Sequence, residues 1–288
     1  MDYVHGYSAG EAQRLNDQAT TLADLLHDGT AYPPGSRVLE AGCGIGAQTA
    51  HLVARSPGAR IVAIDRSARS LEQARQRVSS ASVEWRQGDI FALPFADASF
   101  DHVFVCFVLE HLADPVGALI ALGRVLRPGG TITVIEGDHA TAVFHPDSAD
   151  AQATIDCLVR LQARANGDGL LGRRVQPLLA AAGYHDVRVA PRTVYADATR
   201  PDLVEGFTRQ TFIAMVEPVG PSAIASGLIS RERWERGLDH LRRTAEDGGT
   251  FHYAFFKGVA VRPERAGRSD RRRWVSLSRW TGRTDDDR

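Results

Sequence analysis

The stretch Val38-Leu39-Glu40-Ala41-Gly42-Cys43-Gly44-Ile45-Gly46 decides the fold. Its first residues are mostly apolar, as in a short buried strand, and glycine then recurs at every second position. Glycines here let the chain turn sharply and let a ligand lie against bare backbone. We therefore expect a strand at Arg37–Ala41, a glycine-rich turn, and a helix from about Gly46 to Arg55. Taken alone, the turn is also compatible with a tight connection that binds no ligand.

Strand-like and helix-like segments alternate from this turn onward. Further strands are expected at Arg60–Asp65, Val83–Arg86, Asp101–Val108 and Thr131–Glu136. Helices are expected behind Ser67 and Asp114, since these residue types cap helix N-termini. Strict alternation of this kind predicts an α/β fold, with a parallel sheet that helices cover on both faces.

The segments on either side of this region have other patterns. Residues 1–34 carry an apolar helical stripe and predict an N-terminal helical cap, and residues 35–261 form the main domain. The second half of that domain is expected to hold helices at 148–165, 173–182, 201–216 and 230–245 and strands at 187–195 and 252–261. Residues 262–288 are rich in arginine and poor in aliphatic residues, so we expect a disordered tail there.

Composition excludes several classes of protein. The 288 residues have a formal net charge of −1, so no overall field recruits nucleic acid or an anionic membrane. No apolar run reaches the roughly 18 residues that a membrane span needs. The three cysteines form no CxxC pair, and the histidines and acids lack metal-binding spacing. We therefore expect a cytoplasmic enzyme, monomeric or homodimeric, with no metal ion, nucleic-acid partner or membrane contact.

Acidic residues and glycines stand at the ends of the expected strands. In chain order these are Glu40 with its glycine turn, Asp65, Gly88-Asp89-Ile90 and Leu126-Arg127-Pro128-Gly129-Gly130. Four motifs in this order resemble those of the class I S-adenosylmethionine-dependent methyltransferases, in the branch that acts on small molecules such as quinones and sterols. The resemblance is strong from about residue 37 to residue 137.

The resemblance implies a fold as well as a cofactor. The fold would be Rossmann-like, with a central, mostly parallel sheet, helices on both faces and an antiparallel last strand. Two helical insertions, at about 140–182 and 200–246, would form a lid over the substrate. The cofactor would be S-adenosylmethionine, and the substrate a small molecule.

A set of matching residues is implied to bind the cofactor. The expected set is Tyr7, Glu40, Gly42, Gly44, Gln48, Asp65, Arg66, Asp89, Ile90 and Phe107. The acid and the glycines of the turn would surround the methionine part, and Asp65 would accept both ribose hydroxyls. Asp89 and Ile90 would hold the adenine, and Phe107 would line the site after the fourth strand.

Methyl transfer from a sulfonium asks little of a protein besides alignment and exclusion of water. A base is needed where the acceptor must lose a proton, and open α/β sheets bind ligands at the carboxyl ends of their strands. The expected catalytic residues at those ends are His139, Glu136 and His111. His139 is the expected base because histidine titrates near neutral pH, with Glu136 or Asp138 orienting its ring. A structural role is the alternative for each, and the acceptor atom stays open between oxygen, nitrogen and carbon.

Two other functions stay open on the sequence. Gly42, Gly44 and Ala47 also satisfy the G-x-G-x-x-G/A pattern of nicotinamide-dependent dehydrogenases, although the Gly-Asp-Ile and Leu-Arg-Pro-Gly-Gly segments have no role in that fold. A protein that binds S-adenosylmethionine without transferring its methyl group, either as a catalyst of a rearrangement or as a binding protein, would keep the same motifs. We favour transfer of a methyl group to a small molecule.

Overall fold

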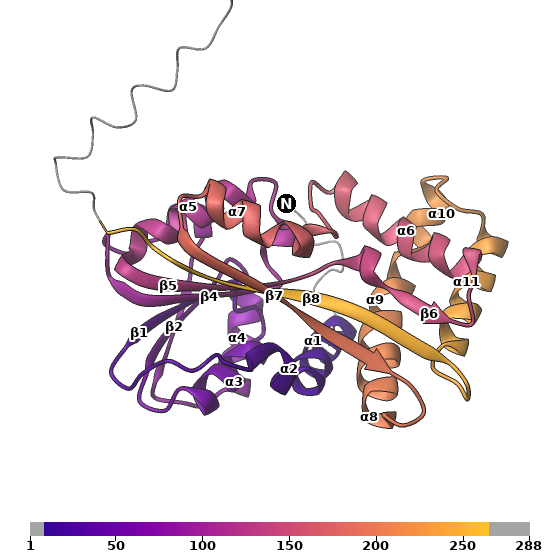
Figure 1. Ribbon diagram of the computed structural model, residues 1–288, viewed down its shortest axis with the longest axis horizontal. Helices are drawn as coiled ribbons and strands as arrows, with labels where there is room; N and C mark the ends of the chain where they lie inside the picture. The colour runs from indigo at the N-terminus through magenta and orange to yellow at the C-terminus, as the bar shows by residue number, and fades with distance from the viewer. Residues whose placement is uncertain (1–8, 265–288) are drawn as a thin grey trace, which may run out of the picture.

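An eight-stranded sheet runs through the computed structural model, which describes residues 9–264 (Figure 1). Its strands are β1 (Arg37–Ala41), β2 (Arg60–Asp65), β3 (Val83–Gln87), β4 (Phe100–Cys106), β5 (Leu126–Gly137), β6 (Val143–His145), β7 (His185–Ala196) and β8 (Thr250–Val261). The order is β3-β2-β1-β4-β5-β8-β6, with β7 paired to β8. Strands β1 to β5 are parallel neighbours, and β8 is antiparallel to β5, β6 and β7. The expected sheet, with its antiparallel last strand, is confirmed.

Helices cover both faces of this sheet. The α-helices are α1 (Ala9–Thr21), α2 (Ala23–His27), α3 (Ala47–Arg55), α4 (Ala68–Arg77), α5 (Pro115–Val125), α6 (Ala149–Arg164), α7 (Val175–Ala181), α8 (Pro201–Leu203), α9 (Ala214–Val216), α10 (Gly220–Ala225) and α11 (Arg231–Arg243). Because neighbouring side chains of a strand point to opposite faces, Val38 belongs to the core cluster that includes Leu52 of α3, while Leu39 belongs to the cluster that includes Leu122 of α5 and Leu179 of α7. None of the described helices is long and apolar enough to cross a membrane.

The expected caps are present where the sequence placed them. The Ser67 side chain accepts a hydrogen bond of 3.1 Å from the Ser70 N–H and begins α4. Asp114 accepts one of 2.8 Å from the Gly117 N–H, and Pro115 follows it as the first residue of α5. Strands β1 and β2 have the predicted bounds. Local chemistry therefore sets the starts of α4 and α5.

Several elements differ from expectation. The N-terminal helical stripe is divided at Leu22 into α1 and α2, and β5 already begins at Leu126, where a turn was expected. Neither β6 nor α10 was anticipated. The expected helix at 201–216 is α8, a π-helical segment from Val204 to Ile213, and α9. In this segment the Thr211 hydroxyl donates to the Gly206 carbonyl five residues earlier, over 2.7 Å, which fits the wider π turn.

The two insertions take different positions. Helices α6 and α8 to α11 lie beyond the parallel strands, around the far end of β8 (Figure 1). Helix α7, which we expected in the lid, packs instead against α5 and β7 as part of the layer that covers the sheet. The boundaries of a substrate lid stay a prediction.

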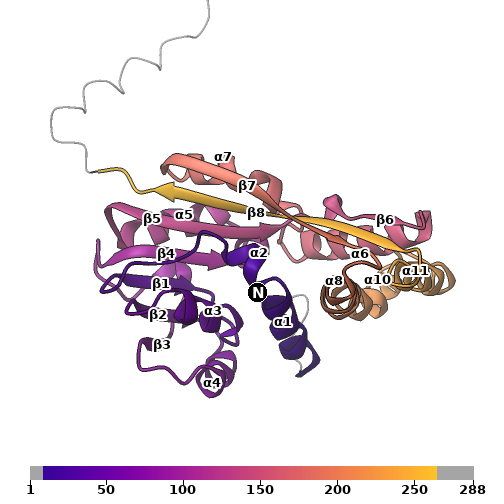
Figure 2. The same ribbon diagram turned by 60° about the horizontal axis from the view of Figure 1, so that its bottom comes forward.

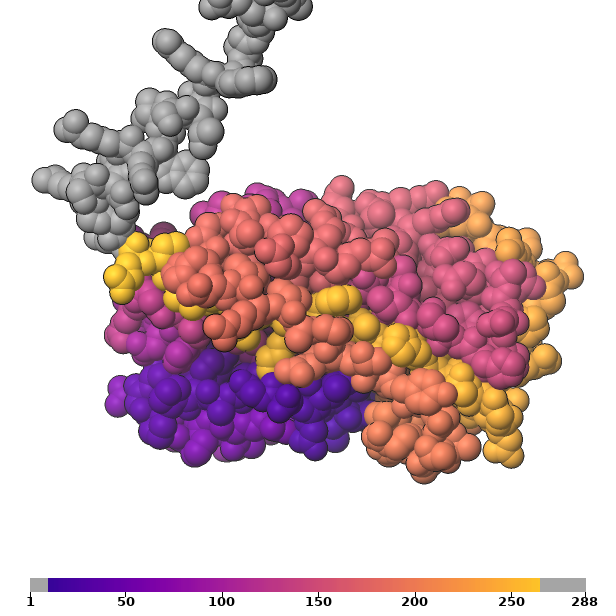
Figure 3. All heavy atoms as spheres, viewed as in Figure 1, coloured from indigo at the N-terminus to yellow at the C-terminus, as the bar shows by residue number. Residues whose placement is uncertain are grey.

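Helix α1 fills the space between the parallel strands and the insertion. Figure 2 shows it between the α3–α4 layer and α8. It contacts the π-helical segment and α3. In the space-filling view the N-terminal part of the chain lies beside the segment that holds α8, which closes this side of the molecule (Figure 3). Tyr7 and the expected tail from residue 265 onward lie outside the described residues.

Candidate active site

The three glycines of the first turn have three different environments. Gly42 has φ +78°, and a Cβ atom there would lie 2.5 Å from Cγ2 of Val108. Gly46 has φ +77° and packs against Ala74 and Trp85, which brings α3 close to α4 and β3. Gly44 has φ +52°, and a Cβ atom there would meet no protein atom within 4 Å. Gly44 therefore presents bare backbone to open space, as a turn that holds a ligand requires.

That open space is a cavity of about 360 Å³ at the carboxyl ends of β1, β2, β3 and β4. Nine of the ten expected cofactor-binding residues line it: Glu40, Gly42, Gly44, Gln48, Asp65, Arg66, Asp89, Ile90 and Phe107. The tenth, Tyr7, is outside the described residues. Residues separated by up to 67 positions in the chain thus converge on one space.

The Asp65 carboxylate organises the glycine turn. Its Oδ2 accepts a hydrogen bond of 2.9 Å from the Gly44 N–H, and its Oδ1 accepts one of 2.8 Å from the Ser67 N–H. Burial raises the pKa of this carboxyl, and the two backbone hydrogen bonds work against that rise. Since each carboxylate oxygen can accept a further hydrogen bond, both can still bind a ligand in the cavity.

Glu40 is almost completely buried at the end of β1, with 2% of its surface exposed. Burial raises the pKa of its carboxyl to about 8, and the neighbouring Asp65 adds to the rise. Within residues 9–264 its Oε2 has no hydrogen-bond partner. A buried polar atom of this kind costs stability unless something satisfies it, so Glu40 fits a ligand that supplies the partner.

The other cavity residues are held by contacts of their own. Oε1 of Gln48 lies 2.7 Å from Nε2 of the buried His27, which fixes the amide on α3. Asp89 accepts a hydrogen bond of 2.9 Å from the Phe91 N–H and caps a short turn that carries Ile90. Phe107 has φ +57°, a left-handed conformation that is uncommon for a bulky residue. Such strain is concentrated at ligand sites in proteins.

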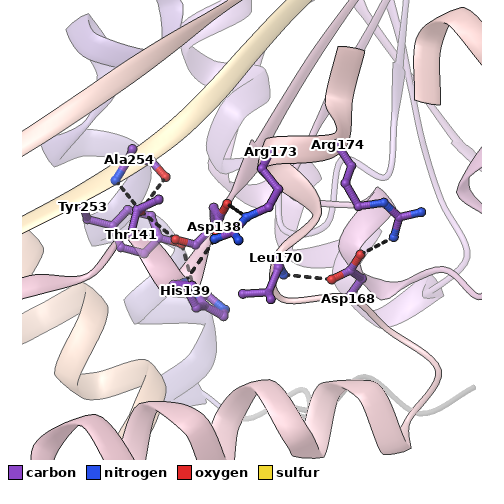
Figure 4. Close-up of polar contacts among 10 residues, drawn as sticks. Asp138, His139, Thr141, Asp168, Leu170, Arg173, Arg174, Tyr253 and Ala254 are labelled. Atoms are coloured by element: carbon purple, nitrogen blue, oxygen red, sulfur yellow. Dashed lines mark hydrogen bonds and ion pairs between the residues drawn. The ribbon is translucent and has the colours of Figure 1, made fainter. Parts of the chain in front are cut away.

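His139 does not line this cavity. It lies at a second, smaller cavity of about 40 Å³, and His111 lines both. Only 3% of the His139 surface is exposed, and burial lowers the pKa of the His139 ring to about 4. Its Nδ1 is 2.9 Å from the Tyr253 hydroxyl (Figure 4).

The expected partners of His139 serve other groups. Glu136 is fully buried, lines neither cavity, and accepts hydrogen bonds from the Val108 and Leu109 N–H groups over 3.1 and 2.8 Å. It therefore positions the loop after β4. Asp138 is also fully buried and is paired with Arg173 (Figure 4). The expectation that one of these carboxylates orients the His139 ring is wrong, because Tyr253 holds that position.

Several residues around the two cavities were not expected. They are Glu11, Leu15 and Gln18 of α1, Gln162 of α6, and Tyr253 and Phe255 of β8. The sequence held one signal for α1, since Gln18 is a polar residue within an apolar helical stripe. Tyr253 and Phe255 are indistinguishable from ordinary core residues in the sequence.

Known proteins resemble this chain in sequence. Residues 39–134 match the family described as "Methyltransferase domain". An uncharacterised protein from a transposon of Streptomyces fradiae is 34% identical over 78% of this chain and 63% of its own length. The 27-O-demethylrifamycin SV methyltransferase of Amycolatopsis mediterranei is 34% identical over 45% of this chain and 49% of its own. The chain thus spans about half to two thirds of the length of these relatives.

Solved structures share the fold. The phosphoethanolamine N-methyltransferase 2 of Haemonchus contortus, solved with phosphomonomethylethanolamine and S-adenosylhomocysteine, superposes with a TM-score of 0.56. The match covers 89% of this chain and 59% of that one, with 18% sequence identity. At this identity the likeness concerns the arrangement of strands and helices.

Proposed function

We propose, from the match of residues 39–134 to the methyltransferase domain family and from the shared fold, that this chain is a class I methyltransferase that binds S-adenosylmethionine and transfers its methyl group to a small molecule. One observation carries the proposal. The nine described residues that the family resemblance selects for the cofactor, taken from separate loops, all line one cavity of about 360 Å³. A cavity of this size lies in the range that small-molecule and cofactor sites occupy.

Each part of the cavity fits one part of the cofactor. The bare backbone at Gly44 and the buried Glu40 carboxyl would meet the methionine part. The free lone pairs of Asp65 would accept the ribose hydroxyls, and the Asp89–Ile90 segment would border the adenine. The bound cofactor would supply an activated methyl group, so the protein's own contribution is alignment and exclusion of water. Helix α1 and Gln162 cover the cavity and provide that exclusion.

The class of acceptor is proposed on separate grounds. The named relative acts, by its name, on a rifamycin, which is a small molecule. Neither positive nor negative charge dominates this chain, whose formal net charge is −1.

The cysteines Cys43, Cys106 and Cys157 are free thiols, in keeping with a reducing compartment, and we place the protein in the cytoplasm on that basis.

Calorimetry with the full-length protein tests the proposal. S-adenosylmethionine and S-adenosylhomocysteine should each bind with one-to-one stoichiometry, and NAD should not bind at the same concentrations. Incubation with labelled S-adenosylmethionine and extracts of small metabolites should then yield a product heavier by one methyl group. Binding of NAD in preference to S-adenosylmethionine would refute the proposal, and binding without any methylated product would favour a non-methylating role.

A further inference from the structure

The smaller cavity combines aromatic walls with buried polar atoms. Its aromatic residues are Phe107, Phe207, Phe212, Tyr253 and Phe255. Four of these rings form one cluster: the centroids of Phe212 and Tyr253 are 5.5 Å apart, and those of Tyr253 and Phe255 are 4.8 Å apart. The cavity borders the cofactor cavity, because Leu15, Gln18, Phe107 and His111 line both. A group in the smaller cavity would therefore lie next to whatever fills the larger one.

Two polar side chains in this wall are more than nine-tenths buried and incompletely bonded. They are His139, with 3% of its surface exposed, and Glu110, with 8%. In the part of the chain that the structure describes, neither Nε2 of His139 nor Oε2 of Glu110 has a partner in full hydrogen-bond geometry, and the side-chain amide of Gln162, which also lacks such a partner, lies beside the His139 ring. In native proteins nearly all buried polar atoms have a hydrogen-bond partner, so each of these two unpartnered atoms, Nε2 of His139 and Oε2 of Glu110, needs an explanation. One explanation is a ligand that forms a hydrogen bond with each of them.

The Tyr253 hydroxyl decides which nitrogen of His139 carries the proton. The hydroxyl has one hydrogen to donate, and its side-chain partner within residues 9–264 is Nδ1 of His139, at 2.9 Å. The backbone N–H of Asp138 already donates to the hydroxyl oxygen. If Nδ1 carried the proton, the buried tyrosine proton would lose its acceptor, and an unsatisfied buried donor destabilises the fold. Tyr253 therefore donates to Nδ1, and the proton of the neutral ring is on Nε2.

His139, which lines the cavity, is thus a hydrogen-bond donor through Nε2. Burial keeps the ring neutral near pH 7, since it lowers the pKa to about 4, and a neutral ring with its proton on Nε2 has no lone pair there. Glu110 is the complementary acceptor. Burial raises the pKa of its carboxyl to about 7, the Arg14 charge on α1 works against that rise, and Asp168 adds to it. A pKa close to neutrality leaves both the ionised and the protonated forms of this carboxyl populated at pH 7, and the ionised form is the acceptor.

One chemical group satisfies both partners at once. A hydroxyl accepts a hydrogen bond through its oxygen and donates one through its proton. A carboxylate would accept from His139 but would place a second negative charge beside an ionised Glu110, and a carbonyl would leave an ionised Glu110 without a donor. The space of about 40 Å³ holds about three water molecules, at roughly 10–15 Å³ each. It therefore suits the reacting end of an acceptor rather than an entire large molecule.

We infer that the smaller cavity is the acceptor subsite and that it takes the uncharged hydroxyl end of a flat molecule, with the oxygen at Nε2 of His139 and the proton at Oε2 of Glu110. This inference rests on the proposed methyl transfer. In that reaction the hydroxyl oxygen forms its bond to the methyl carbon and the carbon–sulfur bond breaks. The bonding pair stays on sulfur, and the hydroxyl proton passes to the Glu110 carboxylate. His139 positions the oxygen and takes no proton.

Nitrogen NMR of the histidine rings tests the tautomer in protein saturated with S-adenosylhomocysteine. We expect His139 to be neutral at pH 7 with its proton on Nε2. Tyr253→Phe removes the donor to Nδ1 and should give a mixture of the two tautomers. The control, Tyr184→Phe, removes a buried hydroxyl that donates to the Leu119 carbonyl on the other face of the sheet, and should leave His139 unchanged. A proton on Nδ1 in the wild type would overturn the inference.

Phenol, toluene and benzoate, which share one ring, test the chemistry of the subsite on the same loaded protein. Phenol should bind at least tenfold more tightly than toluene or benzoate and should shift the Nε2 resonance of His139. In Glu110→Met this preference over toluene should fall to less than threefold, whereas Glu232→Met, at an exposed site on α11, should retain it. Equal binding of phenol and toluene, preference for benzoate, or no binding of phenol would overturn the inference. Failure of the wild type to bind S-adenosylhomocysteine would instead refute the proposed function.

Discussion

Alanine at Gly42 and alanine at Gly44 should separate folding from ligand binding. The two glycines are two positions apart and both have positive φ, so each substitution costs about 1–2 kcal/mol for the left-handed backbone. They differ in what the new methyl group meets. At Gly44 it meets no protein atom within 4 Å, whereas at Gly42 it lies 2.5 Å from Cγ2 of Val108. Overpacking of this kind adds about 1–3 kcal/mol.

Gly42→Ala should therefore lose about 2–5 kcal/mol of unfolding free energy, and Gly44→Ala about 1–2 kcal/mol. Urea unfolding at pH 7.5, monitored by tryptophan fluorescence, gives both values. The affinity for S-adenosylhomocysteine should fall more in Gly44→Ala than in Gly42→Ala, which is the opposite order to the losses of stability. In Gly44→Ala the methyl group stands where the proposed cofactor lies against the backbone, so calorimetry should show S-adenosylhomocysteine binding weakened by about tenfold or more, equivalent to about 1.4 kcal/mol.

A double variant provides the control. Val108→Ala removes the two methyl groups that the new Cβ at position 42 would strike, so the pair Gly42→Ala and Val108→Ala should be less destabilised than the sum of the single variants. It should not restore binding to Gly44→Ala. Equal loss of stability in the two glycine variants, or unchanged affinity in Gly44→Ala, would refute the assignment of separate roles.

Three further outcomes follow from the contacts of single side chains. Asp65→Ala should weaken S-adenosylmethionine binding by about ten- to a hundredfold, whereas Asp97→Ala, which changes an exposed ion pair with Arg124, should bind normally in the same calorimeter. Arg173→Met leaves the Asp138 carboxylate buried without its cation, so urea unfolding should show a loss of about 1–3 kcal/mol; an unchanged midpoint would contradict this. Burial lowers the pKa of His27 from 6.5 to about 4. Between these pH values the unfolded chain therefore binds more protons than the folded chain, and the contribution of this group to stability decreases as the pH falls from 6.5 to about 4. Relative to His27→Gln, the wild type should lose about 2 kcal/mol between pH 7.5 and pH 5, and parallel pH profiles would contradict the assignment.

The parallel half of the fold could be predicted because its signals are local. A buried strand, a glycine turn, a serine or aspartate cap and a proline at the first helical position each act within a few residues, and they fixed β1, β2, α4 and α5. The cofactor residues follow from the same elements, since they stand at strand ends. Once the order of the strands is known, Asp65 and Asp89 must lie at the carboxyl edge of the sheet.

The second half could not be predicted in the same way because its structure depends on packing between distant segments. The π-helical segment has the composition of an ordinary amphipathic helix, and Phe207 and Phe212 become cavity walls only when β8 brings Tyr253 beside them. His139 was placed correctly at the end of β5, but the partner of its ring lies 114 residues away. Without Tyr253, neither its tautomer nor its altered pKa could be inferred.

Helix α1 has a thermodynamic consequence beyond closing the site. Its residues Leu15 and Gln18 border both cavities, so a displacement of the helix that makes room in one changes the walls of the other. If each of two occupants alters the position of this shared wall, their affinities are linked, and the linkage is reciprocal: the factor by which the first ligand alters binding of the second equals the factor by which the second alters binding of the first. Through this helix, binding at the proposed donor site would alter the affinity of the proposed acceptor subsite, and the reverse.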